Sequence, residues 1–180
     1  MTFLEDDVII LRPLEASDAD GAYPEWLNDK QTCVGNGHHR IPYSRSNARD
    51  FISNVNGSLD SIVLAIIKKD AQKHVGNLAL QDICWFSRSA ELAIIVGEDE
   101  GRGNGIGFRA STLLIDHGFT ELNLRSIICK TFSSNSAMIG LAKKLGMKRV
   151  GLLREAAFKN GQYLGVEIYD LLRSDYHAHS

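Results

Sequence analysis

The segment EGRGNGIGFRAS, residues 100–111, carries glycine at every second position from Gly101 to Gly107. An apolar run precedes it and a helix-like pattern follows it. Because glycine has no side chain, the backbone N–H groups of such a loop can turn outward together, and a following helix N-terminus adds unpaired donors and partial positive charge. The segment therefore predicts an anion site suited to a pyrophosphate, with Arg102 as a charged donor at its edge.

Several patterns compete for this loop. A Walker loop is excluded because no Gly-Lys-Ser/Thr sequence follows the glycines. A dinucleotide fingerprint, G-x-G-x-x-A, can be fitted to residues 105–110, but no acidic residue ends the next expected strand, residues 126–131, where a ribose partner is expected. The third pattern is R-x-x-G-x-G over residues 102–107. A glycine turn that binds no ligand is the plainer alternative.

The bulk composition is that of a soluble globular protein. The chain has 180 residues, 44% of them hydrophobic and 23% charged, which predicts one domain over residues 1–180. The net charge of −2 provides no basic field for nucleic acid, and no apolar run approaches the ~18 residues of a membrane span. Cys33, Cys84 and Cys129 lack metal-ligand spacing and are typical of buried thiols in a reducing compartment. With no signal-peptide pattern, we expect a cytoplasmic protein without a metal.

The elements that must position the glycine loop follow from apolar periodicity and turn residues. Strands are predicted at residues 8–14, 61–69, 74–86, 89–98, 125–132, 148–158 and 163–173, and helical segments at 15–29, 44–56, 107–122 and 134–147. Ser17 is a plausible N-cap of the first helical segment, and Pro24 breaks or restarts it. Asn160-Gly161 predicts a tight hairpin between the last two strands. This order predicts an α/β (α+β) fold, a mixed sheet with helices on both faces.

The third pattern of the loop resembles motif A of the GNAT acetyltransferase superfamily. The segment SAELAIIVGEDEGRGNGIG is similar to that family's fourth strand and turn, and RSIICKTFSSNSAMIGLAKKLGMKRVG to its next strand, its asparagine-containing helix and its closing turn. The opening IILRPLEASDAD and WLND, and the ending LREAAFKNGQYLGVEIYDLLRSDY, resemble the branch of ribosomal-protein-alanine and amino-sugar N-acetyltransferases. The likeness covers nearly the whole chain.

The resemblance implies a GNAT-like, mostly antiparallel sheet with a splayed junction between its fourth and fifth strands. It implies transfer of acetyl from acetyl-CoA directly to a primary amine, on a protein N-terminus, an amino sugar or a polyamine, by a monomer or homodimer. Pantetheine would pair along the fourth strand like an added strand, with a backbone N–H near Ile95 toward the thioester oxygen. The residues this assigns to the coenzyme are Ile94, Ile95, Val96, Arg102, Gly103, Asn104, Gly105, Ile106, Gly107, Asn135 and, toward the 3′-phosphate, Lys144.

The resemblance also suggests catalytic residues. Glu91 is the candidate base for the amine. The tyrosine that many relatives place seven residues after the capping asparagine is replaced by Ala142, so Ser134, Ser133, Cys129 or water must protonate the leaving thiolate. A second departure is Gly165, where the family often has Asp. His38 and His39 lie in the loop expected on the acceptor side and are more typical of surface residues. The missing tyrosine leaves a second class of function open, a non-catalytic acyl-CoA-binding or sensing module.

Overall fold

The computed structural model describes residues 1–97 and 103–176. Its strands join one eight-stranded sheet in the order β1-β2-β3-β4-β5-β6-β8-β7, in which every neighbouring pair is antiparallel except β5 and β6. The strands are β1 (Leu4–Glu5), β2 (Ile9–Pro13), β3 (Ile62–Lys68), β4 (Lys73–Cys84), β5 (Ser89–Val96), β6 (Ser126–Phe132), β7 (Lys148–Lys159) and β8 (Gln162–Leu172). The predicted mixed, mostly antiparallel sheet is therefore confirmed.

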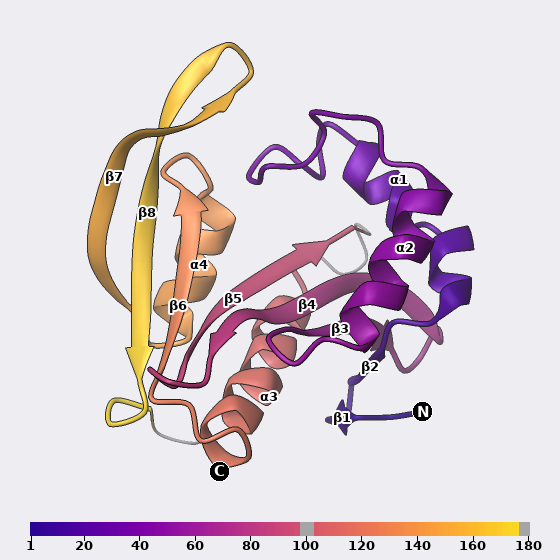
Figure 1. The fold of residues 1–180 in the computed structure, drawn as a ribbon, viewed down its shortest axis with the longest axis horizontal. Coiled ribbons are helices and arrows are strands. Elements are labelled where there is room, and N and C mark those ends of the chain that lie inside the picture. Colours follow the sequence, from indigo (N-terminus) through magenta and orange to yellow (C-terminus); the bar gives the residue numbers. More distant parts are fainter. Residues whose placement is uncertain (98–102, 177–180) are drawn as a thin grey trace.

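Helices cover both faces of the sheet. Successive side chains of β3 show this, because they pack alternately into two different hydrophobic clusters. Leu64 and Ile66 belong to the core cluster that contains the buried side of α3 and α4, whereas Ala65 and Ile67 pack with α1 and α2. Successive side chains of a strand point to opposite faces, so the two clusters lie on opposite sides of the sheet. The helical elements are η1 (Ala16–Asp20), α1 (Tyr23–Asn28), α2 (Arg45–Asn56), α3 (Ile106–Thr120) and α4 (Ser136–Lys144). Figure 1 shows α1 and α2 on one side of the view and α4 with the β7–β8 hairpin on the other.

Local sequence signals account for most of the boundaries. Ser44 caps α2 by accepting the Asn47 N–H, and Pro24 lies in the first turn of α1, so it restarts the helix as expected. Ser17 is not a cap, because it lies inside η1, whose N-cap is Glu15. The two-residue strand β1 was not anticipated, since two residues carry no periodicity.

The β7–β8 hairpin closes at the predicted turn. Asn160 and Gly161 both have positive φ, 51° and 78°, which is the backbone that a type I′ turn requires at its two central positions. The hairpin forms one edge of the sheet and extends beyond its other strands (Figure 1). Its last β7 residue, Lys159, is buried despite its place next to the turn.

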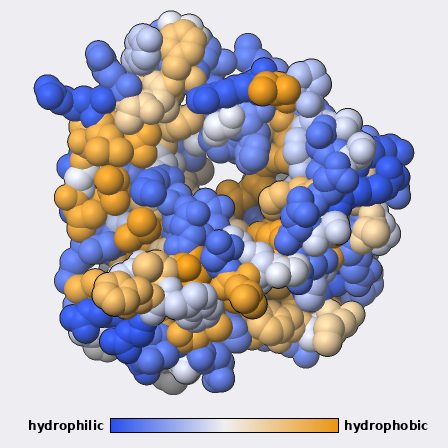
Figure 2. Space-filling view, viewed as in Figure 1, coloured by the Kyte–Doolittle hydropathy of each residue, from blue (hydrophilic) through white to orange (hydrophobic). Residues whose placement is uncertain are grey.

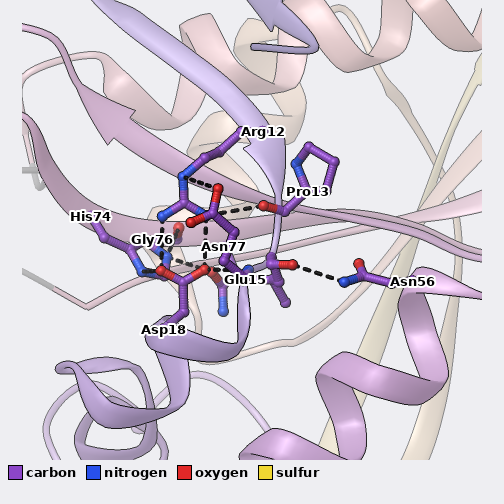
Figure 3. Close-up of polar contacts among 9 residues, drawn as sticks. Arg12, Pro13, Glu15, Asp18, Asn56, His74, Gly76 and Asn77 are labelled. Carbon is purple, nitrogen blue, oxygen red and sulfur yellow. Dashed lines mark hydrogen bonds and ion pairs between the residues drawn. The ribbon is translucent and has the colours of Figure 1, made fainter. Parts of the chain in front are cut away.

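A buried ion pair fixes η1 against the sheet (Figure 3). Arg12 on β2 donates two hydrogen bonds to the carboxylate of Asp18, both at 2.8 Å, and Asp18 also accepts the Glu15 N–H at 2.7 Å. His74 Nδ1 lies 3.3 Å from the same carboxylate, while its Nε2 lies 2.7 Å from Asn77 Oδ1. The Asp18 carboxylate is thus surrounded by donors, and these lower its pKa even though burial alone would raise it.

Within the described residues, no helix is long and apolar enough to cross a membrane.

Candidate active site

The sheet opens between β5 and β6. These parallel strands pair only from Ser89↔Ser126 to Glu91↔Ile128. Beyond that point β5 remains paired with β4 as far as Val96, and β6 remains paired with β8 as far as Phe132. The two halves of the sheet consequently diverge, and Figure 1 shows the wedge between them. The expected splayed junction is therefore present.

Backbone groups of alternate residues of β5 face into this wedge. The Gly97 N–H donates to the Val75 carbonyl at 3.0 Å, and hydrogen-bonded pairs alternate along an antiparallel ladder. Ile95, two residues earlier, therefore turns its N–H and carbonyl toward β4. Ile94 turns its backbone groups the other way, into the wedge. The N–H near Ile95 that faces the wedge is therefore that of Ile94, and its contact with the thioester oxygen stays a prediction.

The glycine loop meets α3 beside this wedge. Gly103 and Gly105 both have φ of 75°, in the left-handed region, and α3 begins directly after Gly105 at Ile106. A Cβ atom built on either glycine would have no described heavy atom within 4 Å, so the backbone is open to a ligand. Asn104 lies between them at the surface, and Arg102 lies outside the described residues. A helix N-terminus that follows such open glycines is suited to an anion.

Two neighbours complete this end of the wedge. Ile106 is buried in the core and anchors the first turn of α3, while Gly107 comes close to Ile94, whose Cδ1 would lie 3.5 Å from a Cβ at Gly107. The Lys144 ammonium from the last turn of α4 lies 4.3 Å from the centre of the Phe108 ring in the first turn of α3. Lys144 thus lies beside the first turn of α3, and its contact with the coenzyme's 3′-phosphate stays a prediction.

Glu91 lies where β5 and β6 separate, and it is ion-paired. Its Oε2 accepts a hydrogen bond from Lys130 Nζ at 2.7 Å, and its side chain is 13% exposed. Ala90 and Leu92 belong to the cluster under α3, so Glu91 faces the opposite side of the sheet, the side of α1 and α2. Glu91 raises the pKa of Lys130 by accepting its hydrogen bond. The pair carries no net charge.

Asn135 joins α4 to the loop between α1 and α2. Its Oδ1 accepts the Met138 N–H at 3.1 Å and so caps the helix, while its Nδ2 donates to the Gly35 carbonyl at 3.0 Å. Both ends of the amide therefore have protein partners, and its expected contact with pantetheine stays a prediction. Ser134 is exposed just before this cap, at the open end of the wedge. Its role as a proton donor likewise stays a prediction.

We call residues 29–44 and the β7–β8 tip that they contact the arch. Besides the Gly35 contact, Lys159 Nζ donates to the His38 carbonyl at 2.5 Å and Arg40 donates to the Phe158 carbonyl at 2.9 Å. The loop therefore spans from α1 to α4 and to the hairpin. Figure 2 shows the surface hollowed near the centre of the view, between the hairpin side and the α1–α2 side. Through the contact of Asn135 with Gly35, the arch lies beside the open end of the wedge.

A family model described as an acetyltransferase (GNAT) domain matches residues 9–148. The chain belongs to the GNAT acetyltransferase family. It is 31% identical over 180 residues to an uncharacterized N-acetyltransferase p20 of Bacillus licheniformis, a match that covers 98% of this chain and 99% of that protein. The chain is accordingly an N-acetyltransferase, and its resemblance to the GNAT superfamily is confirmed.

Two further relatives are named for polyamines. The spermidine N(1)-acetyltransferase of Escherichia coli strain K12 is 36% identical over 98 residues, 54% of this chain and 52% of that one. The solved spermidine N-acetyltransferase from Vibrio cholerae, in complex with CoA and spermine, has a TM-score of 0.85 at 23% identity and covers 94% of this chain and 98% of that chain. The second match shows a shared fold.

The GNAT positions that depart from the family pattern have structural consequences. Ala142 lies on the buried face of α4 and is fully buried in the same cluster as Leu114, so a tyrosine ring there would have to displace core side chains. Cys129 is also fully buried, and burial raises its pKa to about 12, which makes it a poor acid for a thiolate. A Cβ on Gly165 would lie 2.9 Å from Leu152 Cδ1, so the family's Asp does not fit this backbone without movement of that side chain.

Three features escaped the sequence. Lys130 could have been inferred as the partner of Glu91. It follows the buried Cys129 on β6 and so points to the opposite face of the sheet, and β6 is the strand next to that of Glu91. The cap-to-loop contact from Asn135 to Gly35 joins residues 100 positions apart, and no local pattern encodes it. The burial of Lys159 had no signal either, because a lysine before an Asn-Gly turn is typical of a solvated surface.

Proposed function

We propose that this GNAT enzyme transfers the acetyl group of acetyl-CoA directly to a primary amine on a protein N-terminus, an amino sugar or a polyamine. The observation that carries the proposal is the wedge between β5 and β6, into which the Ile94 backbone faces, directly beside the glycine loop at the start of α3. An extended amide-containing arm can pair with an open strand edge while its phosphates lie at a helix N-terminus.

The described residues fit the coenzyme. Gly103 and Gly105 present an accessible backbone to a pyrophosphate, and Lys144 lies beside the same helix start. Arg102, Ile95 and Val96 remain candidate neighbours of the coenzyme from the sequence. The coenzyme supplies an acetyl thioester; the amine nitrogen bonds to its carbonyl carbon, the C–S bond breaks, and the thiolate takes up a proton. The Ile94 N–H is the donor placed to stabilise charge on the thioester oxygen.

The amine must be neutral before it can attack. Freeing an amine of pKa ~10.4 at pH 7 costs roughly 4.6 kcal/mol, whereas an α-amine near ~7.8 costs about 1 kcal/mol. Glu91 lies at the point where the wedge opens, and Lys130 occupies one of its two carboxylate oxygens. We assign Glu91 to accept the amine proton through Oε1, directly or through water. A solvated structural ion pair is the alternative.

The leaving thiolate needs little assistance. A thiol of pKa ~8.5 takes a proton from water favourably at neutral pH, so the absence of a tyrosine at Ala142 is compatible with turnover. The exposed hydroxyl of Ser134 is the side chain we propose as a proton relay to the sulfur, in exchange for a proton from solvent. Its contribution is bounded by that of general acids, about 10²–10⁴-fold.

The test is release of free thiol from acetyl-CoA with a panel of N-terminal peptides, amino sugars and polyamines, alongside calorimetry of acetyl-CoA binding. We expect binding and amine-dependent thiol release, with the acetylated amine identified by mass. If acetyl-CoA binds but no amine accelerates thiol release, the acyl-CoA-binding module replaces the enzyme. If acetyl-CoA does not bind, the assignment of the wedge itself is wrong.

A further inference from the structure

Lys159 is a buried cation at the arch. It ends β7 and is 7% exposed. Lysine is almost never buried to this degree unless it is paired, because its ammonium loses hydration that an opposite charge must replace. A buried lysine therefore needs a hydrogen-bond or ion-pair partner. The nature of that partner determines whether the ammonium can still bind an anionic ligand.

The protein provides Lys159 with a carbonyl instead of a carboxylate. Its Nζ donates to the His38 carbonyl at 2.5 Å, and among residues 1–97 and 103–176 no acidic side chain forms an ion pair with it. Burial lowers the pKa of Lys159; the Cys33 thiol opposes this effect, and the charge of Arg40 adds to it. An ammonium has three N–H donors, so donors remain beyond the one that His38 accepts.

The second cation of the arch is held in the same way. Arg40 is exposed, and it donates to the Phe158 carbonyl at 2.9 Å without an ion pair to any carboxylate in the described part of the chain. Burial, and to a lesser extent the charge of Lys159, lower the pKa of His38. Its imidazole therefore supplies no negative charge that could balance Lys159 or Arg40. Lys159 and Arg40 therefore both meet backbone carbonyls at the arch, and neither forms an ion pair with a carboxylate among the described residues.

Among the described residues, the structure pairs neither of these cations with a carboxylate. Glu91 is already matched by Lys130 at 2.7 Å. A polycation approaching past the arch would meet two like charges, whereas an anion would meet two donors that gain a counter-charge. Charge-assisted hydrogen bonds are about twice as strong as neutral ones.

We propose that the acceptor of this enzyme is a primary amine whose own molecule carries a carboxylate or phosphate group, and that Lys159 and Arg40 bind this anion. The inference rests on the proposed function, since it names the class of amine for the same wedge. An anionic acceptor would differ in charge from spermidine, the polycation for which some relatives are named. Lys159 and Arg40 are specificity residues for the acceptor, and the acetyl group is transferred as described above.

The first experiment compares matched acceptors by kcat/KM for thiol release: glucosamine 6-phosphate against glucosamine, the amidated peptide Ala-Asp-Asp against Ala-Lys-Lys, and spermidine. We expect the anionic member of at least one pair to exceed its partner by at least about tenfold, and spermidine to rank below it. The sugar pair and the peptide pair distinguish a phosphate source from a carboxylate source. The preference should fall between about 50 mM and about 500 mM salt, since charges screen at that ionic strength.

The second experiment removes the charge. Lys159→Met should raise KM for the preferred anionic amine by at least about tenfold, should reduce the preference for it over its neutral or cationic counterpart by a similar factor, and should leave the KM for acetyl-CoA unchanged. Lys148→Met is the control, because Lys148 is an exposed lysine of the same strand that pairs with Asp175 at 2.7 Å. It should change none of these constants.

Three results would overturn the inference. Spermidine or Ala-Lys-Lys as the best acceptor contradicts it while the proposed transferase function stands. An unchanged anion preference in folded Lys159→Met also contradicts it. If Lys159→Met fails to fold, the wild-type acceptor ranking and its salt dependence decide. If acetyl-CoA binds and no amine at all releases thiol, the proposed function fails and this inference fails with it.

Discussion

Arg12 and Lys159 are both cations withdrawn from solvent, yet the protein treats them differently. The Arg12 side chain is 16% exposed, and its guanidinium meets the Asp18 carboxylate through two 2.8 Å hydrogen bonds, with Glu15 at its edge. Lys159 is 7% exposed as a whole residue, and its ammonium meets one backbone carbonyl. The cluster of Arg12, Asp18, His74 and Asn77 is closed, with each charge facing its opposite, whereas the arch is open, with its charges facing the route to the wedge.

The difference separates a structural use of charge from a functional one. A closed cluster holds elements in register, and here it extends toward the site: His74 packs edge-on against Trp26 at 4.9 Å, and a Cβ on Gly97 would lie 2.0 Å from Trp26 Cδ2. The cluster thereby fixes the end of β5, directly before the coenzyme loop. An open arrangement contributes nothing comparable to stability and retains unused donors for a ligand.

The largest expected effect is at the closed cluster. Asp18→Asn should lower the free energy of unfolding by about 3–5 kcal/mol, because Arg12 would remain buried without its counter-charge. Urea denaturation measures the change. The matched control is Asp20→Asn, two residues along, whose partner Arg49 is exposed to the same extent as Asp20 itself, 52% each. That substitution should cost at most about 1 kcal/mol. Equal effects at the two positions would break the comparison.

The same carboxylate predicts how stability depends on pH. The pKa of Asp18 is lower in the folded protein than the ordinary value of 3.8. Above about pH 3.9, where the unfolded chain is also ionised, its stabilising contribution is fully present, and it is lost as pH falls toward the folded value. Wild type should therefore lose stability below about pH 4 more steeply than Asp18→Asn does. If stability falls equally steeply with pH in wild type and Asp18→Asn, Asp18 is not responsible for the loss of stability in acid.

The next effect concerns Glu91, a charge-balanced residue inside the open region. Glu91→Gln should lower kcat/KM at pH 7 by about 10²-fold, and the loss should shrink as pH rises and the amine deprotonates itself. Lys130→Met is the companion variant, because it breaks the same 2.7 Å pair and leaves the carboxylate in place. If both variants lose activity equally and keep the wild-type pH profile, Glu91 is a structural partner of Lys130 and not the base.

Particular residues show how far the sequence could predict this molecule. The hairpin was predictable because Asn160 and Gly161 encode their own backbone, and the cap at Asn135 was predictable for the same local reason. The wedge between β5 and β6 came from resemblance, since it depends on which strand lies beside which. The burial of Lys159 could not be foreseen, because it arises when residues 29–44 close over a hairpin more than a hundred positions away.

A smaller effect is expected at the coenzyme loop. Gly105→Val should weaken acetyl-CoA binding by at least about tenfold, since a branched residue resists the 75° φ and its side chain would occupy the space open to the pyrophosphate. Gly161→Val is the control, with a φ of 78° and equally open surroundings at the hairpin turn. Both should lose about 1–3 kcal/mol of stability, and calorimetry should find weaker acetyl-CoA binding at Gly105 alone. If Gly105→Val and Gly161→Val bind acetyl-CoA with equal affinity, the glycine loop does not bind the coenzyme.

The smallest expected effect is on the stability of Lys159→Met, and it tests the contrast between Arg12 and Lys159 most directly. Burial lowers the pKa of Lys159 in the folded protein, so the folded state releases this proton before the unfolded chain does. The charged lysine consequently opposes folding at neutral pH, and stability attributable to it rises as pH approaches the unfolded value of about 10.4. Lys159→Met should therefore be as stable as wild type at pH 7, or slightly more stable, and the advantage should narrow by pH 10.

Urea denaturation of wild type, Lys159→Met and Lys148→Met across this pH range measures that difference. Lys148→Met removes an exposed pair with Asp175 and should cost at most about 1 kcal/mol at every pH. A Lys159→Met protein that is less stable than wild type by several kcal/mol would make the His38 contact a structural clamp equivalent to the Arg12 pair. Equal or greater stability, together with a lost anion preference, would mean that Lys159 is kept buried at the expense of folding because the acceptor requires it.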